Sequence, residues 1–250
     1  MRWLSFILIL AAVGCGARSD RIDPARGDVI FLVHGAGGAT REYQALIDGL
    51  RDAPVGRPVQ IVSWGAPLPL FFLNFSNAGV HDAAEKSFAT RLRDWRDKHP
   101  NARIDIIAHS AGCGVTLGAL EQLPRDSVHT VVMLHPSVSP YYSLDRAADS
   151  ASHRMHAFVS DRDKLFLHWR TSTFGTYDNV KTPAAGHQGF EHLPPRVVQH
   201  RYDAAWNALG HDGEHFGCLS RRFAQQIIAP LLAAQPAPLA LSQSSVANPR

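Results

Sequence analysis

The chain has 250 residues, of which 45% are hydrophobic and 19% charged, enough for one substantial core and too few for two. Its formal net charge of +3 is scattered along the sequence, which argues against nucleic acid or another polyanion as a partner. The three cysteines, Cys15, Cys113 and Cys218, are too few for a fold held together by disulfides. The composition therefore predicts one domain stabilised by its core.

The first fifteen residues have the features of a signal peptide. Arg2 gives a positive start, residues 3–13 form an apolar run too short to span a bilayer, and small residues precede Cys15. Residues 10–15, Leu-Ala-Ala-Val-Gly-Cys, resemble the lipobox of bacterial lipoproteins, which implies a mature chain that begins at a lipidated Cys15. An ordinary leader cleaved nearby is the alternative. We expect an exported protein, anchored by lipid to a membrane on its periplasmic or cell-surface side, with residues 16–27 as a linker.

From Asp28 onward, short apolar runs alternate with amphipathic stretches. The runs predict strands at residues 29–33, 59–62, 104–107, 128–134, 155–159 and 197–202. Helical spacing predicts helices near residues 43–50, 84–95, 113–122 and 222–232. This rhythm predicts an α/β domain over residues 28–233, with a mostly parallel twisted sheet of about six strands and helices on both faces. Residues 171–195 show no clear period, and the Pro- and Ser-rich residues 234–250 are expected to be a disordered tail.

A serine lies at the junction of a predicted strand and a predicted helix. Residues 108–112 read Ala-His-Ser-Ala-Gly, with Ser110 at the centre. A nucleophile elbow needs this setting, and it needs small residues two positions on either side so that strand and helix can approach. Ala108 and Gly112 meet that requirement, so Ser110 is the candidate nucleophile.

A glycine-rich loop follows the first predicted strand. Residues 34–38 read His-Gly-Ala-Gly-Gly, and glycines let the backbone approach a charged oxygen closely. A phosphate-binding loop is the competing interpretation. It fails because the sequence has no G-x-x-x-x-G-K-[ST] motif.

These motifs, followed by a late Asp and then His, resemble the α/β-hydrolase superfamily over roughly residues 28–232. The resemblance is closest to small bacterial lipase- and esterase-like members, which also have a run like Ala-Ala-Gly-His-Gln-Gly-Phe at residues 184–190 and a late His-Phe-Gly, here residues 215–217. About a dozen residues separate Cys15 from the first strand, so the two leading strands of larger members are expected to be missing.

The resemblance implies the remaining site residues. Two backbone N–H groups, those of Ala36 and Ala111, would form the oxyanion hole. The acid is expected after the strand at residues 155–159, where Asp163 is preferred, Asp161 is the alternative and Asp145 is less favoured. Among the later histidines, His215 before the last helix is preferred over His211 and His187, with a role as general base.

A rival motif overlaps the predicted base. Residues 211–215, His-Asp-Gly-Glu-His, match the inverted zincin pattern H-x-x-E-H. That site needs one continuous helix, which Gly210 and Gly213 oppose, and no Asp or Glu follows His215 to complete the ligands. The sequence therefore implies no metal site and no organic cofactor. His109 is expected to be a wall of the pocket that points away from Ser110.

These features predict a serine hydrolase that forms an acyl-enzyme, with a small ester or a lipid as substrate. The apolar residues 70–75 and the pair Tyr141-Tyr142 could line an acyl pocket, although residues 70–75 could equally be a plug against the sheet. Amidase, thioesterase or acyltransferase chemistry uses the same residues. A lipid-anchored binding protein without turnover is the alternative from another class. Cys113 and Cys218 are expected to be buried thiols, with a disulfide as the alternative.

Overall fold

The computed structural model describes residues 17–21, 27–66, 70–75 and 77–233. The predicted signal peptide with Cys15 and the predicted tail at 234–250 lie outside the described residues. A parallel six-stranded sheet in the order β2-β1-β3-β4-β5-β6 confirms the predicted fold class. Its strands are β1 (Val29–Val33), β2 (Val59–Val62), β3 (Ile104–His109), β4 (Val128–Leu134), β5 (Ala151–Val159) and β6 (Val197–Arg201).

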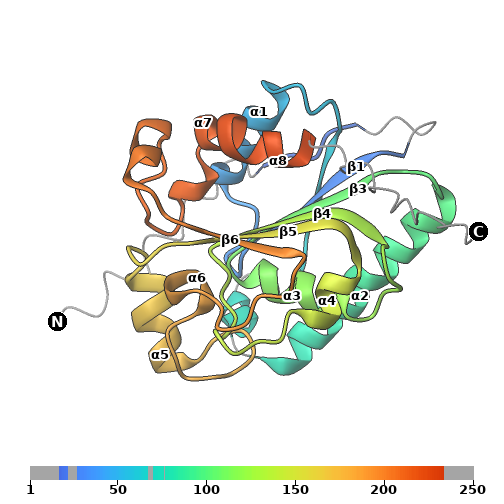
Figure 1. Ribbon diagram of the computed structural model, residues 1–250. Helices are drawn as coiled ribbons and strands as arrows, with labels where there is room; N and C mark the ends of the chain where they lie inside the picture. The colour runs from blue at the N-terminus through green and yellow to red at the C-terminus, as the bar shows by residue number, and fades with distance from the viewer. Residues whose placement is uncertain (1–16, 22–26, 67–69, 76, 234–250) are drawn as a thin grey trace, which may run out of the picture.

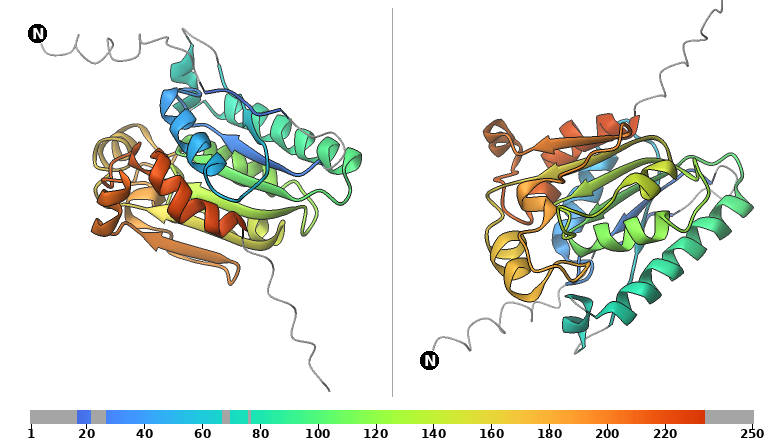
Figure 2. Two further views of the ribbon diagram at one scale, coloured as in Figure 1. Left: turned by 90° about the horizontal axis from the view of Figure 1, so that it is seen from above. Right: turned by 60° about the horizontal axis from the view of Figure 1, so that its bottom comes forward.

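Helices cover both faces of the twisted sheet (Figure 1). One face carries α1 (Arg41–Arg51), α7 (Arg221–Phe223) and α8 (Ala229–Ala233), and the other carries α2 (Ala78–Lys98), α3 (Ala111–Leu120) and α4 (Asp145–Asp149). Figure 2 shows the same layers from above and, in its second view, with the bottom of the molecule turned forward, so that the face carrying α2 and α3 comes toward the viewer. None of the helices in the described ranges is long and apolar enough to cross a membrane.

Two apolar clusters fill the spaces between the sheet and its helices. Phe31 of β1 packs with Phe88 of α2 in the first cluster, and Leu32 packs with Leu46 of α1 in the second. Neighbouring residues of a strand point to opposite faces, so β1 supplies both clusters. A strand buried on both faces reads as a continuous apolar run, which is why the sequence indicated this sheet.

Several short elements were not predicted. They are η3 (Phe71–Phe75), α4, η4 (Leu165–Arg170), α5 (Thr171–Phe174), α6 (Ala185–Gln188), η5 (Ala204–Leu209) and η6 (Gly217–Leu219). Elements of three to six residues are too short for a hydrophobic period to be recognised. The predicted last helix is not regular, because a π-helical segment, η7 (Ala224–Ile228), joins α7 to α8 just before Pro230. A proline has no N–H for the i→i−4 hydrogen bond, and a wider turn accommodates that loss.

Gly49 of α1 packs directly against the backbone of α7. A Cβ atom built on Gly49 would lie 2.1 Å from the carbonyl oxygen of Arg221 and 2.9 Å from Cβ of Ala224. We predict that Gly49→Ala lowers the free energy of unfolding by about 1–3 kcal/mol, because overpacking outweighs the better helix propensity of alanine. Urea unfolding measures this change.

The control for Gly49 is Gly37→Ala, since a Cβ atom on Gly37 meets nothing within 4 Å. The control should change the free energy of unfolding by no more than about 0.5 kcal/mol. Equal losses in the two variants would contradict the packing argument.

Candidate active site

Ser110 lies in a strained turn between β3 and α3. Its backbone angles are φ 55° and ψ −125°, which a non-glycine residue adopts at a cost of roughly 1–3 kcal/mol. A Cβ atom on Gly112 would lie 2.4 Å from the carbonyl oxygen of His34 and 2.5 Å from that of Val33. The predicted strand-turn-helix geometry is therefore present, and the glycine at 112 is required by the close approach of α3 to β1.

Three of the predicted side chains form a continuous hydrogen-bonded chain. Nε2 of His215 lies 3.1 Å from Oγ of Ser110, and Nδ1 of His215 lies 2.5 Å from Oδ2 of Asp163. An ionised carboxylate only accepts, so the Nδ1–H of His215 donates to Asp163 and its Nε2 accepts from the hydroxyl of Ser110. All three side chains are buried, with Ser110 8% exposed and His215 5% exposed.

Asp163 is the fully buried end of this chain. The side chain of Ser160 donates to the carbonyl of Gly213 at 2.6 Å, which ties the loop of Asp163 to the loop of His215. Burial alone would raise the pKa of Asp163, but the charge of His215 and hydrogen bonds from His135 and His215 outweigh burial and hold that pKa well below its usual range. Asp163 therefore stays ionised beside His215.

His135 was not predicted to belong to the site. It follows β4 directly, with a positive φ of 50°, and its Nδ1–H donates to Oδ2 of Asp163 at 3.1 Å. Its Nε2 is buried without a hydrogen-bond partner among the described residues, and burial lowers the pKa of His135. A neutral imidazole that donates through Nδ1 fits these surroundings. The sequence feature that could have indicated His135 is its position directly after a buried strand, because the carboxyl ends of parallel strands meet at one edge of the sheet.

Within the described ranges, His135, Asp163 and His215 form a cluster that could hold a metal ion, because one ligand atom from each lies within 4.8 Å of the others. Two of the contacts, at 2.5 and 3.1 Å, are hydrogen-bond distances. Ligands on a tetrahedral ion with bonds of about 2.0 Å would stand roughly 3.3 Å apart. The spacing fits two histidines that share one carboxylate better than it fits a set of metal ligands.

The alternative residues lie elsewhere. Asp161 is exposed, and Asp145 lies at the start of α4, where it faces His192. His211 is buried, but its Nδ1 accepts from the N–H of Gly213 and its ring stacks on Trp206. His187 stacks on His168. The residues that lie together are those preferred from the sequence.

His109 does not form a wall of the pocket as expected. It is 1% exposed, and its Nε2–H donates to the carbonyl of His215 at 2.9 Å. Its Nδ1 accepts from the hydroxyl of Tyr43 at 2.8 Å, and that hydroxyl accepts from the N–H of Gly35 at 2.7 Å. This buried chain fixes the loop after β1 relative to the loop of His215. Burial lowers the pKa of His109 well below its usual value, so the ring stays neutral.

Two further side chains hold the loop after β1 by hydrogen bonds. The indole N–H of Trp64 donates to the carbonyl of His34 at 2.7 Å, and the side chain of Asn74 donates to the carbonyl of Ala36 at 3.1 Å. Asn74 belongs to η3, so the apolar segment at 70–75 contacts this loop. Ala111 is the first residue of α3, where helix N–H groups lack intrahelical acceptors. Gly35 approaches Ser110 so closely that an added Cβ would lie 3.1 Å from Cβ of the serine.

The hydroxyl of Tyr142 does not reach Ser110. The hydroxyl of Tyr142 donates to Glu121 at the far end of α3, about 16 Å from Ser110 at 1.5 Å per helical residue. Tyr141 is 62% exposed.

Cys113 and Cys218 are both free and buried. They belong to different apolar clusters, on opposite faces of the sheet. The prediction of two buried thiols is confirmed.

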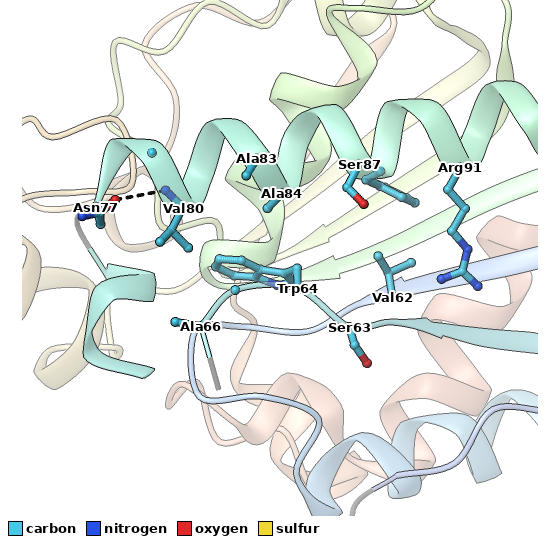
Figure 3. Close-up of a pocket in the computed structure, with 13 residues that line it drawn as sticks. Val62, Ser63, Trp64, Ala66, Asn77, Val80, Ala83, Ala84, Ser87 and Arg91 are labelled. Atoms are coloured by element: carbon cyan, nitrogen blue, oxygen red, sulfur yellow. Dashed lines mark hydrogen bonds between the residues drawn. The ribbon is translucent and has the colours of Figure 1, made fainter. Parts of the chain in front are cut away.

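A cavity of about 580 Å³ lies beside the loop after β1, between α2 and the end of β2 (Figure 3). Trp64 lies beneath α2 in this view, with Arg91 at one end of the cavity and Asn77 at the other. Ser110 is not among the lining residues. Trp64 therefore both lines this cavity and holds the loop after β1, but the cavity is separate from the candidate site.

Comparisons with known proteins support the fold. No protein-family model matches the sequence, and a search of curated proteins gives no match. Among solved structures, lipase B of Aspergillus fumigatus is similar with a TM-score of 0.55 and 16% identity, over 86% of this chain and 56% of the lipase. An esterase of Pyrococcus furiosus is similar with a TM-score of 0.52 and 14% identity, over 84% of each chain. At these identities the likeness shows the fold, which is that of the α/β-hydrolases.

Buried neutral histidines make the stability of the protein depend on pH. Burial lowers the pKa of His211 to about 3 and that of His156 to about 4. The unfolded chain takes up a proton on each imidazole near pH 6.5, whereas the folded protein does so only at lower pH. The unfolded state therefore binds more protons between these values. We predict that stability is lost as the pH falls from about 6.5 toward 4, by up to about 1.4 kcal/mol per pH unit for each such histidine.

Urea unfolding at several pH values between 4 and 7 tests this dependence. His211→Asn should reduce the slope of stability against pH by about 1.4 kcal/mol per unit. His192→Asn is the control, because its side chain is 74% exposed and solvated in both states. An unchanged slope in His211→Asn would show that the folded protein protonates this histidine as readily as the unfolded chain does.

Proposed function

We propose that the protein is a serine hydrolase that acts on carboxylic esters, with Ser110 as nucleophile, His215 as general base and Asp163 as the group that orients His215. The observation that carries this proposal is the hydrogen-bonded chain from Ser110 through His215 to the buried Asp163. The strained turn at Ser110 supports it, because such a turn exposes the hydroxyl at the end of a sheet. The fold is shared with a lipase and an esterase, which agrees with this chemistry but does not select it.

The first half of the reaction transfers the acyl group to the serine. Nε2 of His215 takes the proton of the Ser110 hydroxyl while Oγ attacks the ester carbonyl carbon and forms the tetrahedral intermediate. The imidazolium is stabilised by the ionised Asp163, then gives its proton to the leaving alcohol as the C–O bond breaks. The product is an acyl-enzyme.

The second half returns the enzyme to its starting state. His215 takes a proton from water, the resulting hydroxide attacks the acyl carbon, and the proton is returned to Oγ of Ser110 as the carboxylic acid leaves. In both halves the N–H groups of Ala36 and Ala111 would donate to the oxyanion. Each such donor contributes about 3 kcal/mol to transition-state stabilisation in serine hydrolases. Tyr43, Trp64 and Asn74 hold the loop that carries Ala36.

We further propose that the protein is exported and anchored through lipid on Cys15. The support is the sequence of residues 1–15, with its positive start, short apolar run and lipobox-like end. Acyl chains on this cysteine would hold the chain at a membrane surface, since each buried methylene adds to the binding free energy.

Ser110→Ala and His215→Gln should each lower kcat/KM for a water-soluble short-chain ester by about a thousandfold or more, because they remove the nucleophile or its base. Asp163→Asn should also cause a large loss, because it removes the charge that stabilises the imidazolium. Ester turnover and labelling by a fluorophosphonate probe measure these effects.

Two control variants change the residues that the sequence offered as alternatives to Asp163 and His215. Asp161→Asn and His211→Gln change the alternative acid and the alternative base, and each should retain kcat/KM within about threefold, as expected for residues outside the reacting groups. A folded wild-type protein that neither labels nor hydrolyses any ester would instead favour a binding protein. Turnover confined to amides or thioesters would show that the substrates belong to that class and not to the carboxylic esters.

Mass spectrometry of the N-terminal peptide from the membrane fraction tests the anchor. We expect a mature chain that begins at Cys15 and carries acyl chains, and loss of this species in Cys15→Ser. A mature N-terminus at another residue, without acyl mass, would indicate the ordinary leader.

A further inference from the structure

Five exposed apolar side chains lie in loops and short helices that follow the carboxyl ends of the strands. We define them as the apolar rim, and they are Leu70 (49% exposed), Leu165 (45%), Trp169 (58%), Phe174 (62%) and Phe216 (43%). Leu70 follows β2, three of the others follow β5, and Phe216 is next to His215. All five therefore belong to segments that leave the carboxyl ends of the strands, at the edge where Ser110 lies.

Contacts join these segments to one another and to the site. Phe166 stacks on the ring of His215 with centroids 4.5 Å apart and meets Phe216 edge-on at 5.7 Å. The guanidinium of Arg170 lies 4.7 Å from the ring centroid of Phe75, which links the segment 165–174 to η3. The apolar rim is thus carried by segments in mutual contact. Exposed apolar side chains that gather on neighbouring segments indicate a place of interaction.

The start of the described chain indicates what lies against this edge. Residues 17–20 run along the outer edge of β2, in the opposite direction. Asp20 exchanges hydrogen bonds with Val59 at the beginning of the strand, and Oγ of Ser19 accepts from the N–H of Ile61 further along it. The segment continues to Ala17, whose N–H donates to the carbonyl of Ala39 at 3.3 Å. Ala17 therefore lies at the carboxyl edge of the sheet, beside the loop after β1.

The position of Ala17 bears on a lipid attached to Cys15. Only Gly16 separates the two residues in the sequence. Ala39 is four residues from Gly35, which contacts Ser110, and four residues span at most about 14 Å. Acyl chains on Cys15 would therefore be attached next to the edge of the sheet at which Ser110 lies. An anchor at the opposite edge of the sheet would have turned the site away from the membrane.

We propose that the apolar rim docks on a phospholipid bilayer, so that the site opens toward the lipid and takes its ester from the membrane. The substrate part of this proposal rests on the proposed function, whereas the docking part does not. Trp169 and Phe174 insert at the interface, where an aromatic side chain suits the boundary between headgroups and acyl chains. The occupant of the rim is a bilayer, because the N-terminal segment brings the predicted lipid attachment to the same edge.

The docking arm measures quenching of tryptophan fluorescence by brominated lipid. The mature protein, as processed by the host and purified from its membranes, is mixed with phosphatidylcholine vesicles that contain brominated phosphatidylcholine. We expect quenching in the wild type and its loss in Trp169→Phe, which removes the reporter but keeps an aromatic ring at the rim. Quenching that is equal in the two proteins would overturn the docking proposal, whether or not Cys15 is acylated.

The catalytic arm compares a long-chain ester in the vesicles with a water-soluble short-chain ester. Trp169→Ser combined with Phe174→Ser should lower turnover of the bilayer ester by roughly tenfold or more and leave turnover of the soluble ester within about twofold, because only the first substrate requires docking. The matched control is Tyr141→Ser combined with Leu193→Ser. These two side chains are also exposed, at 62% and 39%, but belong to two other segments, which the hydrogen bond between Glu191 and Pro140 joins.

The two arms separate the failure of docking from the failure of the proposed function. Quenching without turnover of either ester would reject ester hydrolysis and retain docking. Turnover of the soluble ester without quenching would retain hydrolysis and reject docking. An equal loss of bilayer turnover in the rim variant and in the control would also overturn the proposal. Self-association of the wild type without vesicles, abolished in the rim variant, would overturn it in favour of a second copy of the chain as the occupant of the rim.

Discussion

The close approach of α3 to β1 is the constraint on which the geometry of the site depends. Gly112 leaves room for the carbonyls of Val33 and His34, and this approach holds Ser110 in its left-handed turn. The same turn presents the hydroxyl to His215 and brings the N–H groups at the start of α3 beside the loop after β1. The strain of one residue is thus maintained by a helix that is buried along its whole length.

A single buried carboxylate organises the other half of the site. Oδ2 of Asp163 accepts from both His135 and His215, which come from opposite ends of the second half of the chain. Leaving such a charge without donors would cost several kcal/mol, so the two imidazoles stabilise the folded state as well as the ionised acid. The buried chain through Tyr43 and His109 extends this order to the loop after β1. Polar networks of this kind fix one arrangement of loops that have little apolar packing of their own.

The parallel sheet places all of these groups on one edge. Ser110 follows β3, His135 follows β4 and Asp163 follows β5, because parallel strands end at the same side. The N-terminal segment reaches this edge only because it runs against the direction of β2. The parallel direction of the strands therefore places the reacting groups, the exposed apolar residues and the first described residues of the chain at one edge of the sheet.

The sequence by itself determined the six strands and the three longer helices, because strands buried on both faces and amphipathic helices leave periodic signals. The small-residue elbow indicated Ser110, and the family resemblance indicated Asp163 and His215, which lie in hydrogen-bond contact with one another and with the serine. Tertiary structure alone decided the roles of His135 and His109, the place of Tyr142 and the packing of residues 17–20. Each of these depends on contacts between segments distant in the chain, such as the 66 residues between Tyr43 and His109, and such contacts leave no periodic signal. Helices of only one or two turns were not predicted for a related reason, because long-range packing and not local propensity stabilises them.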